Sequence, residues 1–386
     1  MTHRERAIKA LNHEDTDFVP IDFGGSYDTT ITQAAYKKLK KYLGQEEIGY
    51  DIAVFSEGSI FPDEELFKSL NCSFRPVSLP ASTYDIHWNN DGSSEYIDEY
   101  EVLLRRPKGG YFFDLAKPSL VGELTIKKVE EFKWPRLNPQ DLKNAINEVA
   151  LKAKQIHEEK NYAIVGNFLM APIAVTMLIR GFEDWSMDIM QNHKAIEALM
   201  DGFIDFSLEK GIEFYKKVGK YCDVVYCVGD DLATQDGLWF PPEIYKKYLK
   251  PRHKRIIDTV KKYTDAKILF HCCGAASDLF PDFIEIGVDI VTPVQVSSKG
   301  MDSKRLKKEY GKSLVFWGGI DTQYVMPFGT PEEVKKEVFK RLDDFFIDGG
   351  YILNTVHNIL PDVPPENVIA LIKAAEDWFK QRKKLV

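Results

Sequence analysis

Short apolar runs recur along the chain, and most of them end in a small or polar residue. Polar residues do not alternate along these runs, which is typical of strands buried on both faces of a parallel sheet. Amphipathic stretches with helical spacing lie between them. Seven such runs span residues 18–23, 162–166, 223–229, 267–271, 289–294, 314–318 and 351–356, and residues 73–78 are a candidate for an eighth.

Strand and helix alternate steadily from about Tyr162 onward, which predicts consecutive βα units. Eight units would close a (β/α)8 TIM barrel, and we expect residues 1–386 to form one such domain. The alternative is an open doubly wound sheet. That alternative is less favoured because no Gly-x-Gly-x-x-Gly follows a predicted strand.

Residues 84–120 interrupt this alternation. One run begins at Tyr84 and another spans Glu101–Arg106, with the turn residues Asn90, Asp91 and Gly92 between them. This pattern predicts an antiparallel hairpin between about Tyr84 and Arg106, inserted near the barrel mouth.

Composition narrows the class of protein. Hydrophobic residues make up 44% and charged residues 28% of the chain, which is typical of a globular protein. The formal net charge of −8 does not favour nucleic acid as a partner. No signal peptide or membrane-spanning stretch is evident, so we expect a cytoplasmic protein. Five cysteines, an odd number, argue against a disulfide framework.

The sharpest chemical signal is Phe270–Gly274, at the end of an apolar run. Side chains alternate along a strand, so His271 and Cys273 should face one way and Cys272 the other. Imidazole and thiolate are ligands that Zn²⁺ prefers, and barrel active sites lie at the carboxyl ends of the strands. A buried histidine with two packed cysteines is the equally weighted alternative.

His357 follows the last predicted strand and would lie on the same rim. It could be a metal ligand, a general acid or a loop histidine with a structural role. Two carboxylates, Asp230 and Asp231, follow another strand, and at most one should point inward. The inward one could complete a metal shell or bind substrate, or it could cap the next helix. Cys227 is a weaker candidate on the face of Asp231.

Two further strand ends carry candidate substrate-binding residues. Gly318 and Gly319 would let the backbone approach a ligand, or simply turn the chain, and Asp321 follows them. Gln295 could donate a hydrogen bond into the same mouth.

Together these segments resemble the uroporphyrinogen-decarboxylase superfamily, over nearly the whole chain and most strongly from about Gly229 onward. The resemblance rests on His271–Gly274, Ile286–Asp289, Pro293–Gln295, Gly318–Asp321, Gly349–Leu353, His357–Ile359, Pro364–Asn367, Arg4–Leu11 and Val19–Pro20. It implies a (β/α)8 barrel enzyme.

Two branches of this superfamily compete. The true decarboxylases act on a tetrapyrrole without a cofactor, and they carry a Met-Arg-Gln-Ala-Gly-Arg-Tyr segment near the N-terminus. This chain has Asp22–Tyr27 at that place, without an arginine. The other branch, the corrinoid-dependent methyltransferases, binds Zn²⁺ through a His-x-Cys pair and a later cysteine. His271 and Cys273 match the pair, but His357 stands where the later cysteine would be.

The resemblance therefore implies a zinc methyltransferase of the O-demethylase type. The metal would be held by His271, Cys273 and His357, with His357 and Asp231 as catalytic residues and Asp230, Gln295, Gly319 and Asp321 as substrate-binding residues. A methyl group would move between a small molecule, such as a methoxyaromatic ether, and the cobalamin of a separate corrinoid protein. The alternatives are uroporphyrinogen decarboxylation and a non-catalytic corrinoid- or tetrapyrrole-binding protein.

Overall fold

The centre of the molecule is a curled, seven-stranded parallel sheet. The computed structural model describes residues 1–136 and 138–383. The strands follow one another around the sheet in chain order, and every neighbouring pair is parallel. They are β4 (Phe74–Ser78), β9 (Ala163–Met170), β10 (Val224–Gly229), β11 (Lys267–His271), β12 (Ile290–Thr292), β13 (Val315–Ile320) and β14 (Tyr351–Thr355).

Ile21 closes the gap between the first and last strands. It forms parallel bridges to Cys72, just before β4, and to Leu353 in β14. The segment around Ile21 thus takes the eighth place in the ring, and the predicted TIM-barrel fold is confirmed. All eight predicted apolar runs lie in this ring.

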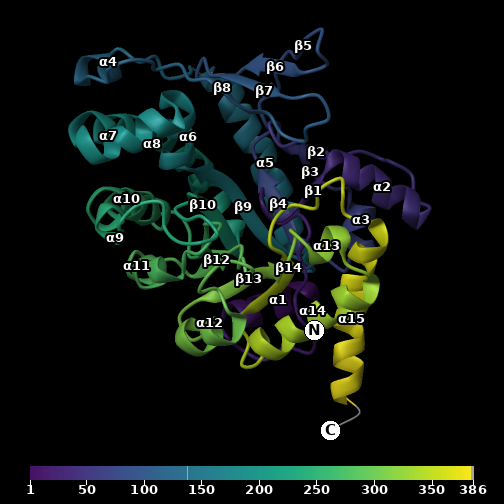
Figure 1. The fold of residues 1–386 in the computed structure, drawn as a ribbon. Helices are drawn as coiled ribbons and strands as arrows, with labels where there is room; N and C mark the ends of the chain where they lie inside the picture. The colour runs from purple at the N-terminus through teal and green to yellow at the C-terminus, as the bar shows by residue number, and fades with distance from the viewer. Residues whose placement is uncertain (137, 384–386) are drawn as a thin grey trace.

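Helices surround the sheet on its outer side (Figure 1). Apolar side chains between the sheet and the helices form the larger hydrophobic cluster, as each βα unit buries one face of its helix. A capping box formed by Thr330 and Glu333 starts α14. The main outer helices are α5 (Pro139–Glu159), α6 (Pro172–Arg180), α7 (Phe182–Gln191), α8 (His193–Val218), α10 (Lys250–Val260), α11 (Phe280–Glu285), α12 (Ser303–Tyr310), α14 (Pro331–Phe345) and α15 (Pro365–Lys383).

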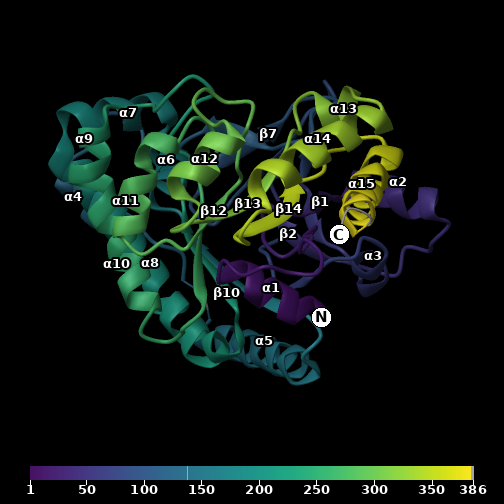
Figure 2. The same ribbon diagram turned by 90° about the horizontal axis from the view of Figure 1, so that it is seen from below.

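The N-terminal helix α1 (His3–Leu11) covers the bottom of the barrel, as the view from below shows (Figure 2). Its residues Ala7 and Leu11 pack with the inward-pointing side chains of the strands, including Phe74 and Trp317. This second cluster fills the lower interior, so the barrel is open for chemistry only at the carboxyl ends of its strands.

Shorter elements connect the barrel and its rim. They include a small antiparallel sheet of β1 (Ile31–Thr32), β2 (Asp51–Val54) and β3 (Ser59–Phe61). The short helices are α2 (Gln33–Leu43), α3 (Glu64–Ser69), α4 (Ile126–Glu130), α9 (Pro242–Ile244) and α13 (Val325–Phe328). Within the described residues, none of the helices has the length and apolar character needed to cross a membrane.

The inserted segment forms a four-stranded antiparallel sheet at the top of Figure 1, rather than one hairpin. Its strands are β5 (His87–Trp88), β6 (Ser94–Ile97), β7 (Leu103–Arg106) and β8 (Asp114–Lys117). The predicted turn around Gly92 joins β5 to β6, so the expected direct pairing of the Tyr84 run with Glu101–Arg106 is wrong. The four-residue strand β6 lies between them. Its polar residue Ser94 is buried, whereas its apolar residue Ile97 is exposed, which is the reverse of the usual pattern.

Candidate metal centre

Three potential metal ligands meet at the upper rim of the barrel. His271 ends β11, Cys273 lies two residues further on, and His357 lies two residues beyond β14. One ligand atom from each lies within 4.8 Å of the others. Nε2 of His271 is 3.5 Å from Sγ of Cys273, and the two imidazole rings are perpendicular, with centroids 5.7 Å apart. The structure therefore brings together the three residues that the sequence indicated.

Cys272, between them in the chain, points away from this group. It is buried, and its Sγ accepts a hydrogen bond from the backbone N–H of Leu232 at 3.4 Å. Alternation along the strand end therefore separates a cysteine that faces the mouth from one that packs in the core.

A carboxylate that sequence reasoning missed lies beside both histidines. Asp28 is 3.4 Å from Nδ1 of His271 and 3.8 Å from Nε2 of His357, and its side chain is only 12% exposed. The phenol of Tyr226 donates a hydrogen bond to it. The one available signal was position, because Asp28 follows the chain segment that completes the ring at Ile21.

Burial and charge act in opposite directions on these groups. Burial lowers the pKa of His357, and Asp28 only partly offsets this. Burial would also lower the pKa of His271, but the charges of Asp28 and Cys273 and the hydrogen bond to Asp231 raise it well above its usual value. Burial raises the pKa of the Cys273 thiol, against the effect of the His271 imidazole.

The two consecutive carboxylates after β10 point in opposite directions. Asp231 faces the histidines: its Oδ1 is 3.4 Å from Nε2 of His271 and accepts the backbone N–H of Cys273 at 2.8 Å. Partial burial would raise the pKa of Asp231, but the hydrogen bond and charge of His271 lower it. Asp231 thus fixes the loop that carries Cys273.

Asp230 lies outside this group, on the far side of the sheet. It is 2% exposed, bonds His253 at 2.9 Å and accepts the backbone N–H groups that begin α6. Its carboxylate is thus occupied by helix capping, and we withdraw the expected substrate contact. Cys227 is buried within the larger core cluster because the strand register shifts between Tyr226 and Val228. That irregularity invalidates the alternation by which Cys227 was placed beside Asp231.

Two other residues that we expected to contact the substrate, Gln295 and Asp321, accept hydrogen bonds from backbone N–H groups. Oε1 of Gln295 accepts the N–H of Gly274 at 2.7 Å, which fixes the loop after Cys273. Asp321 accepts the backbone N–H groups of the three residues 323–325 and so starts α13. Gly319 lies within β13, paired with Asn354, and its φ of 93° falls in the left-handed region that favours glycine. Gln295 and Asp321 thus lie near strand ends as predicted, but their side chains position the neighbouring loops.

A second unexpected acid, Glu57, lies near the centre. Its carboxylate accepts a hydrogen bond from the side chain of Asn358 at 3.0 Å. Burial, followed by the charge of Asp28, raises the pKa of Glu57 to about 8. Burial thus favours the protonated form of the Glu57 carboxyl group.

A cavity of about 500 Å³ opens between the barrel rim and the inserted sheet, and we call it the mouth cavity. Asp28 and Glu57 line it from the barrel side, and Tyr84, Tyr96 and Leu104 line it from the insertion. Because Asp28 contacts both histidines, the mouth cavity adjoins the three potential ligands. Its size suits a small organic molecule.

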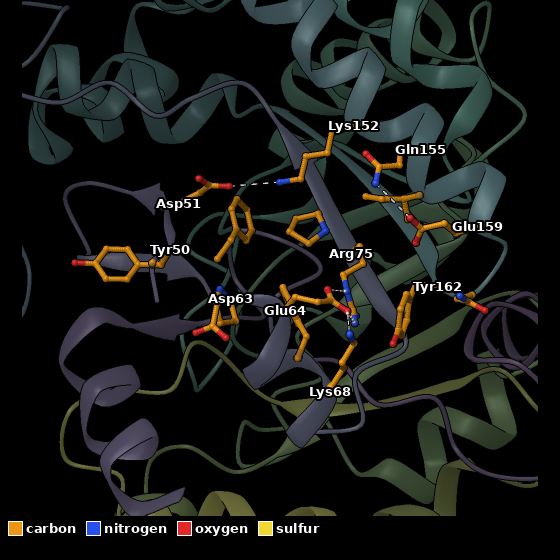
Figure 3. A pocket seen from close by; sticks show the side chains of 17 residues that line it. Tyr50, Asp51, Asp63, Glu64, Lys68, Arg75, Lys152, Gln155, Glu159 and Tyr162 are labelled. Atoms are coloured by element: carbon orange, nitrogen blue, oxygen red, sulfur yellow. Dashed lines mark hydrogen bonds and ion pairs between the residues drawn. The ribbon is translucent and has the colours of Figure 1, made fainter. Parts of the chain in front are cut away.

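A larger cavity, of about 700 Å³, lies elsewhere, between α3, β4 and α5, and it is shown in Figure 3. Its charged side chains pair with one another: Arg75 binds Glu64 at 2.7 Å, and Lys152 lies 3.4 Å from Asp51. Asp28, which contacts both histidines and lines the mouth cavity, is not among the residues that line this larger one. We therefore place the chemistry at the barrel mouth.

Comparison with known proteins agrees with this architecture. A uroporphyrinogen decarboxylase from Prochlorococcus marinus is 26% identical over 296 residues, covering 74% of this chain and 78% of that protein. A methylated-thiol–coenzyme M methyltransferase from Methanosarcina mazei is 25% identical over 209 residues, covering 54% and 52%. The solved structure of a methyltransferase from Methanosarcina mazei superposes with a TM-score of 0.66 at 18% identity, covering 98% of this chain and 99% of that one.

The similarity in fold thus extends over the whole barrel, including the inserted sheet. The family model described as uroporphyrinogen decarboxylase matches residues 114–378, which is more than half of the chain. The chain therefore belongs to the uroporphyrinogen decarboxylase family.

Proposed function

We propose that this protein is a zinc-dependent methyltransferase that moves a methyl group between a small molecule and the cobalamin of a separate corrinoid protein. The observation that carries the proposal is the convergence of His271, Cys273 and His357 within 4.8 Å at the barrel mouth, with Asp28 beside both histidines. Sequence similarity to a methylated-thiol–coenzyme M methyltransferase from Methanosarcina mazei supports the same branch of the family.

The donor set fits Zn²⁺. Two imidazoles and one thiolate are among the ligands of catalytic zinc sites, in which three protein ligands leave one position open for a substrate. Nδ1 of His271 is buried and has no hydrogen-bond partner among the described residues. This nitrogen remains available to donate to Asp28 when Nε2 holds a metal, which is the usual role of a carboxylate behind a ligating histidine.

A bound Zn²⁺ would supply Lewis acidity that makes the donor oxygen of a methyl ether a better leaving group. Asp28 would hold His271 and His357 in their ligating orientation, and Asp231 would fix Cys273 through its backbone N–H. In the transfer, the bond between the methyl carbon and the ether oxygen breaks and the oxygen keeps that electron pair. The methyl carbon bonds to Co(I) of the partner protein, whose electron pair forms the new bond.

Decarboxylation of a porphyrinogen is the second candidate, since relatives at 24–26% identity over about three quarters of the chain bear the name uroporphyrinogen decarboxylase. Such a substrate carries several carboxylates and calls for basic side chains. Residues Asp22–Tyr27, where true decarboxylases carry arginine, contain no basic residue. In a cofactor-free decarboxylase His357 would act as a general acid instead of a metal ligand.

Metal analysis together with a methyl-transfer assay tests the proposal. Purified protein should contain stoichiometric zinc and should methylate free cob(I)alamin, followed by the absorbance of the corrinoid, with a methoxyaromatic donor. Cys273→Ala should lose both zinc and transfer, whereas the matched variant Cys272→Ala should keep them. Equal zinc content in the two variants would remove Cys273 from the centre. Turnover of a porphyrinogen by metal-free protein would establish the decarboxylase instead.

A further inference from the structure

The mouth cavity carries negative charge without a positive counterpart among its lining residues. Four carboxyl groups line it, and none of the residues that line it is lysine, arginine or histidine. Asp28 lies beside His271 and His357, and Glu57 accepts a hydrogen bond from Asn358. The other two carboxylates, Asp98 and Glu99, lie on the loop between β6 and β7 of the inserted sheet.

Asp98 and Glu99 are held in place by neutral donors. Oδ1 of Asp98 accepts the backbone N–H groups of Tyr100 and Val102, both at 2.9 Å, and Glu99 accepts the hydroxyl of Tyr84. The salt bridges of the described residues include neither carboxylate. Lys210 is near enough for the charge of Glu99 to affect its pKa, but its ammonium lies over the ring of Phe206 and does not line the cavity.

Aromatic rings form the wall beside these two carboxylates. The rings of Tyr84 and Tyr96 stack with centroids 4.6 Å apart. Phe55 stands nearly perpendicular to both, at 5.3 Å from Tyr84 and 5.2 Å from Tyr96. Aromatic rings attract a cation through their negative faces, and the attraction grows when the site excludes water. Rings next to unpaired carboxylates are therefore a suitable environment for an ammonium group.

We propose that the mouth cavity selects an aryl methyl ether whose end remote from the methyl group carries an ammonium group, and that it rejects anionic donors. This inference rests on the proposed methyltransferase function and specifies its substrate class. The ammonium lies between Glu99 and the aromatic wall, while the methyl ether points to Asp28 and the metal ligands. The ammonium takes no part in the bond changes: the methyl–oxygen bond breaks, the oxygen keeps the electron pair, and the methyl carbon bonds to Co(I).

The test compares three donors of equal size: 4-methoxybenzylamine, 4-methoxytoluene and 4-methoxybenzoate. With free cob(I)alamin, kcat/KM should decrease in that order. Binding is measured separately by calorimetry with benzylamine and benzoate, which have no methyl group to transfer. Benzylamine should bind about tenfold or more tightly than benzoate, the effect of one charge-assisted hydrogen bond against a like-charge contact.

Substitutions in the loop between β6 and β7 test whether its carboxylates cause the preference for benzylamine over benzoate. Because Glu99 lies at the exposed edge of the cavity, Glu99→Gln should weaken benzylamine binding about three- to tenfold. The double variant Asp98→Asn/Glu99→Gln should weaken it further and should lower the ratio of kcat/KM for 4-methoxybenzylamine to kcat/KM for 4-methoxytoluene. Glu101→Gln is the matched control, because Glu101 is exposed on the same loop and does not line the cavity. Thermal unfolding of each variant verifies its fold.

The possible outcomes separate this inference from the function on which it rests. Equal binding of benzoate and benzylamine, absence of binding by both, or an unchanged preference in the double variant would overturn the charge selection, even if ethers are demethylated. Selective binding of benzylamine without demethylation of any of the three donors would overturn the methyltransferase and leave the cation site standing.

Discussion

Removal of the charge of Asp28 is the most direct test of how the proposed centre is held together. Asp28→Asn keeps the size of the side chain and an oxygen that can accept one hydrogen bond, but it loses the negative charge 3.4 Å from His271 and 3.8 Å from His357. Two full charges at 3.4 Å would attract by about 5 kcal/mol at an effective dielectric constant of about 20. The actual loss should be smaller, because a ligating imidazole is neutral and the asparagine keeps its dipole.

Carboxylates behind ligating histidines typically contribute about 10- to 100-fold to metal affinity. We therefore expect the zinc Kd of Asp28→Asn to rise by this factor, or about 1.4–2.7 kcal/mol. Competition with a chromophoric chelator at constant pH measures it, and Asp236→Asn, on an exposed loop, is the matched control. An unchanged Kd would show that Asp28 does not orient the histidines. A loss as large as that of Cys273→Ala would make Asp28 a ligand itself.

Three other predictions address neighbouring parts of the barrel. His357→Cys should keep zinc and some methyl transfer, whereas His357→Ala should lose zinc; full zinc content in His357→Ala would mean that His357 is not a ligand. Cys272→Ala should lower the free energy of unfolding by about 1 kcal/mol through lost packing, as measured by urea denaturation. Burial raises the pKa of Asp22 from 3.8 to about 7, so the folded state favours its protonated form. That contribution to stability is present in full below about pH 4 and is lost as the pH rises through 7, by roughly 4 kcal/mol at about 1.4 kcal/mol per pKa unit. Asp22→Asn should therefore show a flatter decline of stability between pH 4 and 8, and an unchanged decline would mean that Asp22 is ionised in the folded protein.

The barrel could be predicted because its strands are buried on both faces. Such strands must be apolar along their whole length, and that composition is visible in a single sequence. The same rule placed His271 and Cys273 on one side of the strand end and Cys272 on the other, which the structure confirms. The same rule wrongly placed Cys227 on the face of Asp231, because an irregularity in β10 breaks the alternation of side chains there.

Asp28 could not be predicted because no periodic pattern governs its position. It lies in an irregular segment after the bridges of Ile21, and its partners His271 and His357 are more than two hundred residues away in the chain. The choice between Asp230 and Asp231 depended on His253, a partner 23 residues further along the chain. The strand order of the insertion was missed because the buried residue Ser94 is polar.

The two halves of the proposed site differ in how firmly the fold holds them. The metal ligands lie at or just after the ends of barrel strands, and the loop that carries Cys273 is fixed by hydrogen bonds that the backbone N–H groups of Cys273 and Gly274 donate to Asp231 and Gln295. The far wall of the mouth cavity comes from an inserted sheet whose loop at Asp98 and Glu99 is held by local bonds alone. Rigid positioning favours chemistry, and loops at a barrel mouth can change without disturbing the core. Under the proposed function, the metal centre and the choice of donor would therefore be separable in this fold, and the preference for a cationic donor would be set by the inserted sheet.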